Sequence, residues 1–133
     1  MKQFLLAAAL SLALPAAASA ERVLDAESFD ALTLGQTFTF AEQGRAYGIE
    51  QYLPNRRVRW AFLDGECKDG HWWEERGMIC FAYEDNPDPQ CWTFVESEAG
   101  LSARFENDPA GTFLYEVSRS PEPLECKGPE VGV

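Results

Sequence analysis

The sequence predicts an all-β domain, a small antiparallel meander of about eight strands that closes into a barrel or packs as a sandwich. Apolar and polar residues alternate with a period of two along several short segments, and turn residues separate these segments at regular intervals. Aromatic residues are plentiful, and 16 of the 17 Phe, Trp and Tyr residues lie after residue 20. So many large rings can build a core, which argues against a disordered acidic chain despite the net charge of −11.

The first predicted element is a short N-terminal helix that begins near Asp25 and ends at Gly35. Asp25 or Ser28 can cap its first turn, and Phe29 and Leu32 can pack against the rest of the domain. After Gly35 the apolar period becomes two, so we expect strands from that point to the C-terminal tail.

Eight segments then fit short strands, in the order 37–40, 47–53, 57–62, a strand through residues 72 and 73, 78–83, 91–95, 101–105 and 112–117. The segment 85–89 contains Pro87 and Pro89, which lack the N–H group that a sheet requires, so we expect it to lie outside any sheet. The tail 118–133 holds three further prolines and is expected to be irregular.

Residues 1–20 are typical of a cleavable export signal. Lys2 supplies a positive start, the apolar stretch from Phe4 to Leu14 is too short to span a bilayer, and small residues at 18–20 form a cleavage site. We therefore expect a mature single domain over residues 21–133 that is periplasmic or secreted. No lipid anchor is expected, because the residue directly after the cleavage point is Glu21 and not a cysteine.

All four cysteines, Cys67, Cys80, Cys91 and Cys126, lie in this mature part, which indicates disulfides in an oxidising compartment. If residues 83–90 form the end of a hairpin, Cys80 and Cys91 lie opposite each other on one face. Cys67 lies well past the position opposite Cys80 in the preceding hairpin, which leaves Cys67 to pair with Cys126. Zinc or redox chemistry is disfavoured, because the chain has no C-x-x-C pair and a single histidine.

Several segments together resemble a family of small exported proteobacterial all-β proteins of unknown function with a lipocalin-like small barrel. The resemblance is carried by YGIEQYLP at 47–54, WAF at 60–62, GHWW at 70–73, ICFAY at 79–83 and CW at 91–92. It covers residues 29–105 and implies the fold and the exported compartment. These motifs are turn glycines, core rings and a cysteine pair, so the resemblance carries over no activity and no catalytic residue.

The charge limits the classes of partner. Twenty-two acidic side chains stand against 11 basic ones without a basic stripe, so we expect neither nucleic acid nor an anionic membrane as a partner. No segment after the export signal is apolar enough to span a membrane. The ordinary consequence of such charge is a well-solvated surface, and the alternative is attraction of a cationic protein.

The adjacent rings of Trp72 and Trp73 indicate a contact surface. Neighbours in a strand point to opposite faces, so one ring is expected in the core and the other on the surface, unless both faces are covered. We expect Trp73 to be the core ring, although strand parity leaves the choice close to even. Arg57 and Arg59 lie on the face opposite Trp60, and they either pair with acids on a neighbouring strand or hold an anionic ligand or partner.

A candidate partner for these two arginines is an acid near Glu50 on the neighbouring strand.

No catalytic pattern rises above background in the sequence. His71, the only histidine, is expected to be a strand residue at the edge of the core. Asp64, Glu66 and Asp69 could approach a calcium ion, but their spacing does not match a calcium-binding loop. We therefore expect no metal and no cofactor.

These observations favour a non-enzymatic periplasmic binding or interaction module whose ligand is a protein or a small molecule. The alternative is an acidic inhibitor of a cationic secreted enzyme, such as a cell-wall hydrolase, which the charge, the small size and the disulfides suggest. An enzyme ranks last, because no catalytic constellation is recognisable in the sequence.

Overall fold

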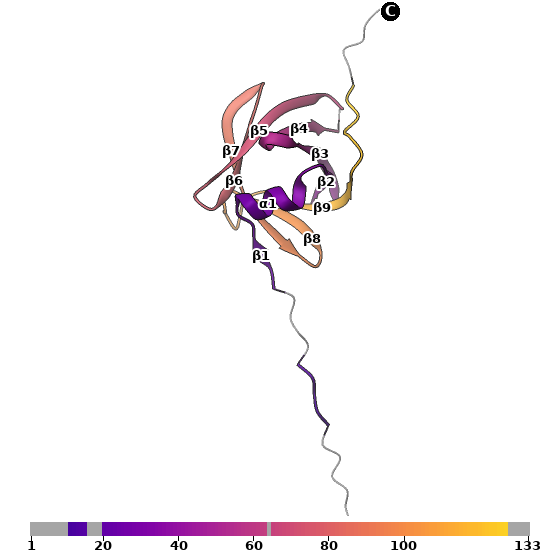
Figure 1. Ribbon diagram of the computed structural model, residues 1–133, viewed down its shortest axis with the longest axis vertical. Coiled ribbons are helices and arrows are strands. Elements are labelled where there is room, and N and C mark those ends of the chain that lie inside the picture. The colour runs from indigo at the N-terminus through magenta and orange to yellow at the C-terminus, as the bar shows by residue number, and fades with distance from the viewer. Residues whose placement is uncertain (1–10, 16–19, 64, 128–133) are drawn as a thin grey trace, which may run out of the picture.

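The computed structural model describes residues 11–15, 20–63 and 65–127, and within them it contains nine strands, one α-helix and one 3-10 turn (Figure 1). The strands are β1 (Arg22–Val23), β2 (Thr37–Glu42), β3 (Arg45–Leu53), β4 (Arg57–Phe62), β5 (Cys67–Glu75), β6 (Met78–Tyr83), β7 (Asn86–Ser97), β8 (Gly100–Phe105) and β9 (Phe113–Ser120). The helix is α1 (Ala26–Thr33), and the 3-10 turn is η1 (Pro54–Arg56).

Eight of these strands close into an antiparallel barrel. Each strand from β2 to β9 pairs with the next along the chain, and β9 returns to pair with β2, where Thr37 lies opposite Ser120. The strands form a ring in Figure 1, and the short β1 lies beside β7. The prediction of an all-β domain of about eight strands is confirmed, and the architecture is the barrel, which leaves no exposed sheet edge in the ring.

The helix α1 closes one end of this barrel. Asp25 Oδ1 accepts a hydrogen bond from Ser28 N at 2.9 Å, and Ser28 Oγ accepts one from Asp25 N at 3.0 Å, so the two residues form a reciprocal cap that starts the helix. Phe29 is fully buried among core rings, with its ring centroid 4.7 Å from that of Phe94 and 5.0 Å from that of Trp72. Figure 1 shows α1 lying across the ring of strands.

Both predicted disulfides are confirmed. Cys80 and Cys91 are register partners on β6 and β7, with their Cα atoms 3.9 Å apart. Cys67, at the start of β5, bonds to Cys126 with a Cα separation of 5.5 Å. This second bond holds the C-terminal segment against the barrel, where Lys127 N also donates to the Gly65 carbonyl oxygen at 2.8 Å.

Two expectations about irregular segments are wrong. β7 begins at Asn86, so Pro87 and Pro89 lie inside a strand. In the β6–β7 ladder, Phe81 pairs with Gln90 and Tyr83 pairs with Asn86, so residues 87–89 form an exposed bulge without ladder partners. The two prolines fit there because the bulge requires no N–H group from them. The expected tail begins too early, since residues 118–120 belong to β9 and pair with β2.

The predicted export signal lies largely outside the described residues, which include only 11–15 and 20 of the first 20. Within the part of the chain that the structure describes, we find no helix with the length and apolar character needed to cross a membrane.

Candidate ligand-binding site inside the barrel

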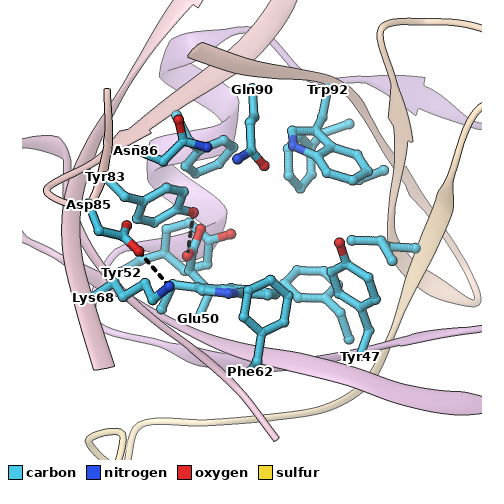
Figure 2. Close-up of a pocket in the computed structure, with 16 residues that line it drawn as sticks. Tyr47, Glu50, Tyr52, Phe62, Lys68, Tyr83, Asp85, Asn86, Gln90 and Trp92 are labelled. Atoms are coloured by element: carbon cyan, nitrogen blue, oxygen red, sulfur yellow. Dashed lines mark hydrogen bonds and ion pairs between the residues drawn. The ribbon is translucent and has the colours of Figure 1, made fainter. Parts of the chain in front are cut away.

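The inward-facing side chains fill the barrel at the end that α1 closes and leave a cavity of 230 Å³ toward the other end. Sixteen residues line this cavity, at least one from each barrel strand, and nine of them are aromatic. Figure 2 looks into it: Asn86, Gln90 and Trp92 lie on one side, and Phe62 and Tyr47 lie on the opposite side. The arrangement is a mostly apolar interior with a few polar groups, as in small-molecule sites.

Three rings from β3 and β4 form one wall of the cavity. The ring centroids of Trp60 and Phe62 lie 5.3 Å apart, and that of Tyr47 lies 5.8 Å from Trp60 and 5.7 Å from Phe62. The two pairs that include Phe62 are edge-to-face, an arrangement that suits the quadrupoles of aromatic rings. Phe62 is 45 % exposed, so this wall reaches the rim of the cavity.

Tyr47 lines the cavity because β3 carries a bulge at this position. Along the β2–β3 ladder, Phe40 pairs with Gly48 and Ala41 pairs with Ala46, so Tyr47 is the extra residue. A bulge redirects the side chain of the extra residue relative to regular alternation. In Figure 2 the hydroxyl of Tyr47 points toward the open space.

Two glycines allow large rings to lie against the backbone of a neighbouring strand. A Cβ atom at Gly48 would lie 2.3 Å from Trp60 Cζ2, and one at Gly70 would lie 2.7 Å from Tyr83 Cδ1 and 2.4 Å from the Ala82 carbonyl oxygen. Real Cβ atoms do not approach other atoms so closely. The absence of a side chain at both positions therefore leaves the space that the rings of Trp60 and Tyr83 occupy.

Glu50 is the buried acid of the cavity and is only 3 % exposed. It lies on β3 between Phe38 of β2 and Trp60 of β4, and its Oε2 accepts a hydrogen bond from the Tyr83 hydroxyl at 2.9 Å. Burial raises the pKa of Glu50 to about 8, while the hydroxyls of Tyr83 and Tyr52 oppose the rise. Near neutral pH the side chain is therefore mostly a neutral acid that can give up a proton.

Tyr52 adds a second polar group to the floor of the cavity. Its Oη atom is buried and makes no hydrogen bond within the described part of the chain, although it lies close enough to Glu50 to affect the pKa of that acid. Burial, together with the nearby Glu50, raises the pKa of Tyr52 well above its ordinary value, so the phenol stays protonated. The Tyr52 hydroxyl is therefore able to donate a hydrogen bond to a polar group that enters the cavity.

The mouth of the cavity is polar. Lys68 Nζ of β5 lies 2.5 Å from Asp85 Oδ2, which belongs to the turn after β6 (Figure 2). Asn86 and Gln90, both of β7, add amide groups to the lining. Because the positive charge of Lys68 is paired at the mouth, the interior itself combines aromatic rings, phenol hydroxyls and the single acid Glu50.

The structure reverses the expectation for the adjacent tryptophans. Trp72 is the core ring, 2 % exposed and in edge contact with Phe29, whereas Trp73 points outward. The expectation that Trp73 is the core ring is therefore wrong, and the reason is the register between β5 and β6. Trp72 pairs with Phe81 and so shares the inward parity of β6, while Trp73 pairs with Cys80 on the outward face.

The other predicted contact residues gather outside the barrel. Arg57 lies opposite His71 in the β4–β5 register, and Trp73 stacks on His71 with ring centroids 5.3 Å apart. Arg59 Nε lies 2.8 Å from Asp69 Oδ1, so this arginine pairs with an acid of the neighbouring strand, as one alternative held. The partner is therefore Asp69 of β5 and not an acid near Glu50 of β3, whose side chain lies inside the barrel. Trp72 belongs to the core and is separated from this outer face by the sheet.

His71 is exposed on the outer face and not at the edge of the core, so that expectation is wrong. Of the three acids considered for calcium, Asp64 lies outside the described residues and Asp69 is paired with Arg59. In the part of the chain that the structure describes, the one group of three potential metal ligands is Glu75 with Cys80 and Cys91. The two sulfur atoms of that group are already joined in a disulfide.

The acid and the two phenols of the cavity, Glu50, Tyr52 and Tyr83, were not predicted as site residues from the sequence. A signal was present, since Glu50 stands two residues before Tyr52 and therefore points to the same face. The segment GIEQYL alternates weakly, however, and either of its faces could be the inner one.

The comparisons add no relative from which a function could be transferred. No model of a protein family, no curated protein and no solved structure matches this chain.

Proposed function

We propose that this protein is a non-enzymatic binding protein that holds a small, largely apolar molecule inside its barrel. The observation that carries the proposal is the 230 Å³ cavity, which nine aromatic side chains and one buried acid line. It exceeds the about 150 Å³ of an engineered apolar cavity that binds benzene, and it is smaller than the usual site for drug-sized molecules. A ligand with a single ring or a compact alkyl group fits this size.

The proposal includes the compartment. Disulfides form and persist in oxidising compartments, and this chain contains two. With the signal-like residues 1–20, this supports export to the periplasm or the medium, where the binding of a small molecule in transit would take place. Edman sequencing of the exported protein, with Glu21 as the expected first residue, tests the cleavage.

Binding is tested with two uncharged compounds, toluene and cyclohexanol, followed by ligand-observed NMR and by the fluorescence of Trp60 and Trp92, which line the cavity. Ala103 lines the same cavity and is 2 % exposed, so Ala103→Leu should fill part of it and weaken binding at least tenfold. Ala46→Leu adds the same atoms at an exposed position of β3 and should leave binding unchanged.

Equal binding by the wild type and Ala103→Leu would place any bound compound outside the barrel and contradict the proposal. Failure of both compounds, and of the charged probes described below, to bind at millimolar concentration would also contradict it. Circular dichroism of the two variants establishes that both remain folded.

A second candidate function, inhibition of a cationic secreted hydrolase, is favoured by one exposed feature. The turn between β6 and β7 carries Glu84 and Asp85, and the adjoining bulge of β7 carries Asp88 between two prolines, which stiffen it. An acidic, rigid loop is suited to approach a basic active-site cleft. The test is inhibition of a purified cationic lysozyme at 20 mM and 300 mM NaCl: stoichiometric inhibition that weakens with salt supports this function, and unchanged lysozyme activity at both salt concentrations contradicts it.

A further inference from the structure

Among the Asp, Glu, Lys and Arg side chains of the described residues, Glu50 is the one that is almost fully buried, and no ion pair is found for it there. Its recorded contact is the hydroxyl of Tyr83, which is a neutral donor. Burying an ionisable group without a charged partner is costly for folding. An apolar residue at this position would stabilise the core more than an acid does. The acid is therefore suited to binding a ligand that enters the cavity.

The rings around Glu50 favour positive charge. The faces of aromatic rings carry negative potential, and an organic cation within about 6 Å of such faces is attracted to them. Trp60 is the register partner of Glu50 on β4, and Tyr83 and Tyr52 lie beside the carboxyl group. The acid and the aromatic rings therefore line the same small space.

The charges that face the cavity lead to the same conclusion. The lining includes two acids, Glu50 and Asp85, and one base, Lys68. Lys68 is paired with Asp85 at the mouth, so its charge is balanced there and not by Glu50. The chain as a whole has a net charge of −11, which raises the local concentration of cations and repels anions.

We infer that the ligand of this cavity is a small organic cation, an ammonium compound with a compact apolar body whose positive group pairs with Glu50 among the aromatic rings. The inference rests on the proposed binding function and specifies its ligand class. The hydroxyl of Tyr52, which lacks a partner within the described residues, supplies a hydrogen bond to any polar substituent on that ligand.

Cation binding is coupled to a proton. Glu50 has a pKa of about 8 in the folded protein, so below this pH the cation must displace the acid's proton, and the observed affinity falls tenfold for each unit of pH. The other titratable groups that line the cavity with Glu50 are Tyr47, Tyr52 and Tyr83, whose pKa values are raised, and the Lys68–Asp85 pair at the mouth. The phenols stay protonated through this range.

The experiment compares three molecules of nearly equal shape: choline, the uncharged 3,3-dimethylbutan-1-ol and the anionic 3,3-dimethylbutanoate. Calorimetric titration at pH 8.5 should show choline binding at least tenfold more tightly than the alcohol and far more tightly than the anion. Between pH 7.5 and pH 6, choline affinity should fall about tenfold per unit, whereas the affinity of the alcohol should not fall.

Glu50→Gln should lower choline affinity at pH 8.5 at least tenfold and leave the affinity of the alcohol within twofold. Glu98→Gln removes the same charge from an exposed turn and is the matched control, which should bind choline like the wild type. Urea unfolding of both variants shows whether each is folded.

The outcomes separate the two proposals. If the alcohol or the anion binds inside the barrel as tightly as choline, the ligand class is wrong while the binding function stands. If choline binding does not change with pH or with Glu50→Gln, the assignment to Glu50 is wrong. If none of the three molecules binds, and neither toluene nor cyclohexanol binds, the binding function fails as well.

Discussion

Tyr83 of β6 donates a hydrogen bond to Glu50 of β3 at 2.9 Å across the interior of the barrel. The two strands are not neighbours, because β4 and β5 lie between them in the sheet. The bond therefore joins opposite parts of the wall through the lumen. Since Tyr83 is a neutral donor, it favours the charged form of Glu50 without supplying a counter-charge.

Removing this donor should raise the pKa of Glu50 further. Tyr83→Phe keeps the ring and deletes the hydroxyl, so the carboxylate loses a bond that stabilises its charged form. The measurement is an NMR titration of the Glu50 side-chain carboxyl carbon in the wild type and in the variant. An unchanged or lower pKa in Tyr83→Phe would show that the hydroxyl does not stabilise the carboxylate.

Glu50 should make the wild type less stable as the pH rises. The folded pKa of about 8 exceeds the ordinary value of 4.5, so between these values the folded protein holds a proton that the unfolded chain has released. The free energy of unfolding therefore decreases by up to about 1.4 kcal/mol per pH unit in this window, with no contribution to the slope below pH 4.5 or above pH 8.

Glu50→Gln isolates this effect, because glutamine keeps the shape and does not titrate. Urea unfolding at pH 4.5, 6 and 8 should show that the variant gains stability relative to the wild type as the pH rises. A difference between the two proteins that is constant over this range would contradict the raised pKa. Glu98→Gln, at an exposed position, should show no such trend.

The adjacent tryptophans should differ in their contribution to stability. Trp72→Ala removes a ring that is 2 % exposed and packs on Phe29, which should cost about 3–5 kcal/mol. Trp73→Ala affects an outer ring that stacks on His71, and the cost should be less than about 1 kcal/mol. Urea midpoints at pH 7 give both values, and equal losses would contradict the register of β5.

The two disulfides should stabilise the domain unequally. Cys67–Cys126 closes a sequence separation of 59 residues and Cys80–Cys91 one of 11, so chain entropy predicts about 4 and about 3 kcal/mol. Paired Cys→Ser variants, compared by thermal and urea unfolding, measure these losses. If the variant that lacks Cys80 and Cys91 is the less stable of the two, effects in the folded state outweigh loop closure.

Local patterns predicted much of this fold. The capping pair Asp25 and Ser28 marked the start of the helix, and alternation at Val58, Trp60 and Phe62 marked an inward face of a strand. Cys80 and Cys91 were assigned to each other because hairpin register depends on a few residues between two strands. These features depend on neighbours in the chain, which a sequence displays directly.

The candidate site could not be predicted in the same way. The bulge at Tyr47 depends on how β2 and β3 pair, and nothing in the local sequence distinguishes it from a regular strand. The inward direction of Trp72 depends on its pairing with Phe81, so strand parity alone could not decide between the two tryptophans. Both questions are settled by partners on another strand.

The all-β class and the short helix were predictable because the apolar period and the turn residues are local properties, and Cys67 was left to pair with Cys126 once hairpin register had assigned Cys80 to Cys91. Closure of the sheet, through the pairing of β9 with β2, is visible only in the folded molecule. Closure turns one face of every strand toward a common interior, and there it brings Glu50, Tyr52 and Tyr83 together. A buried acid is recognisable only once the surfaces that exclude water from it are in place.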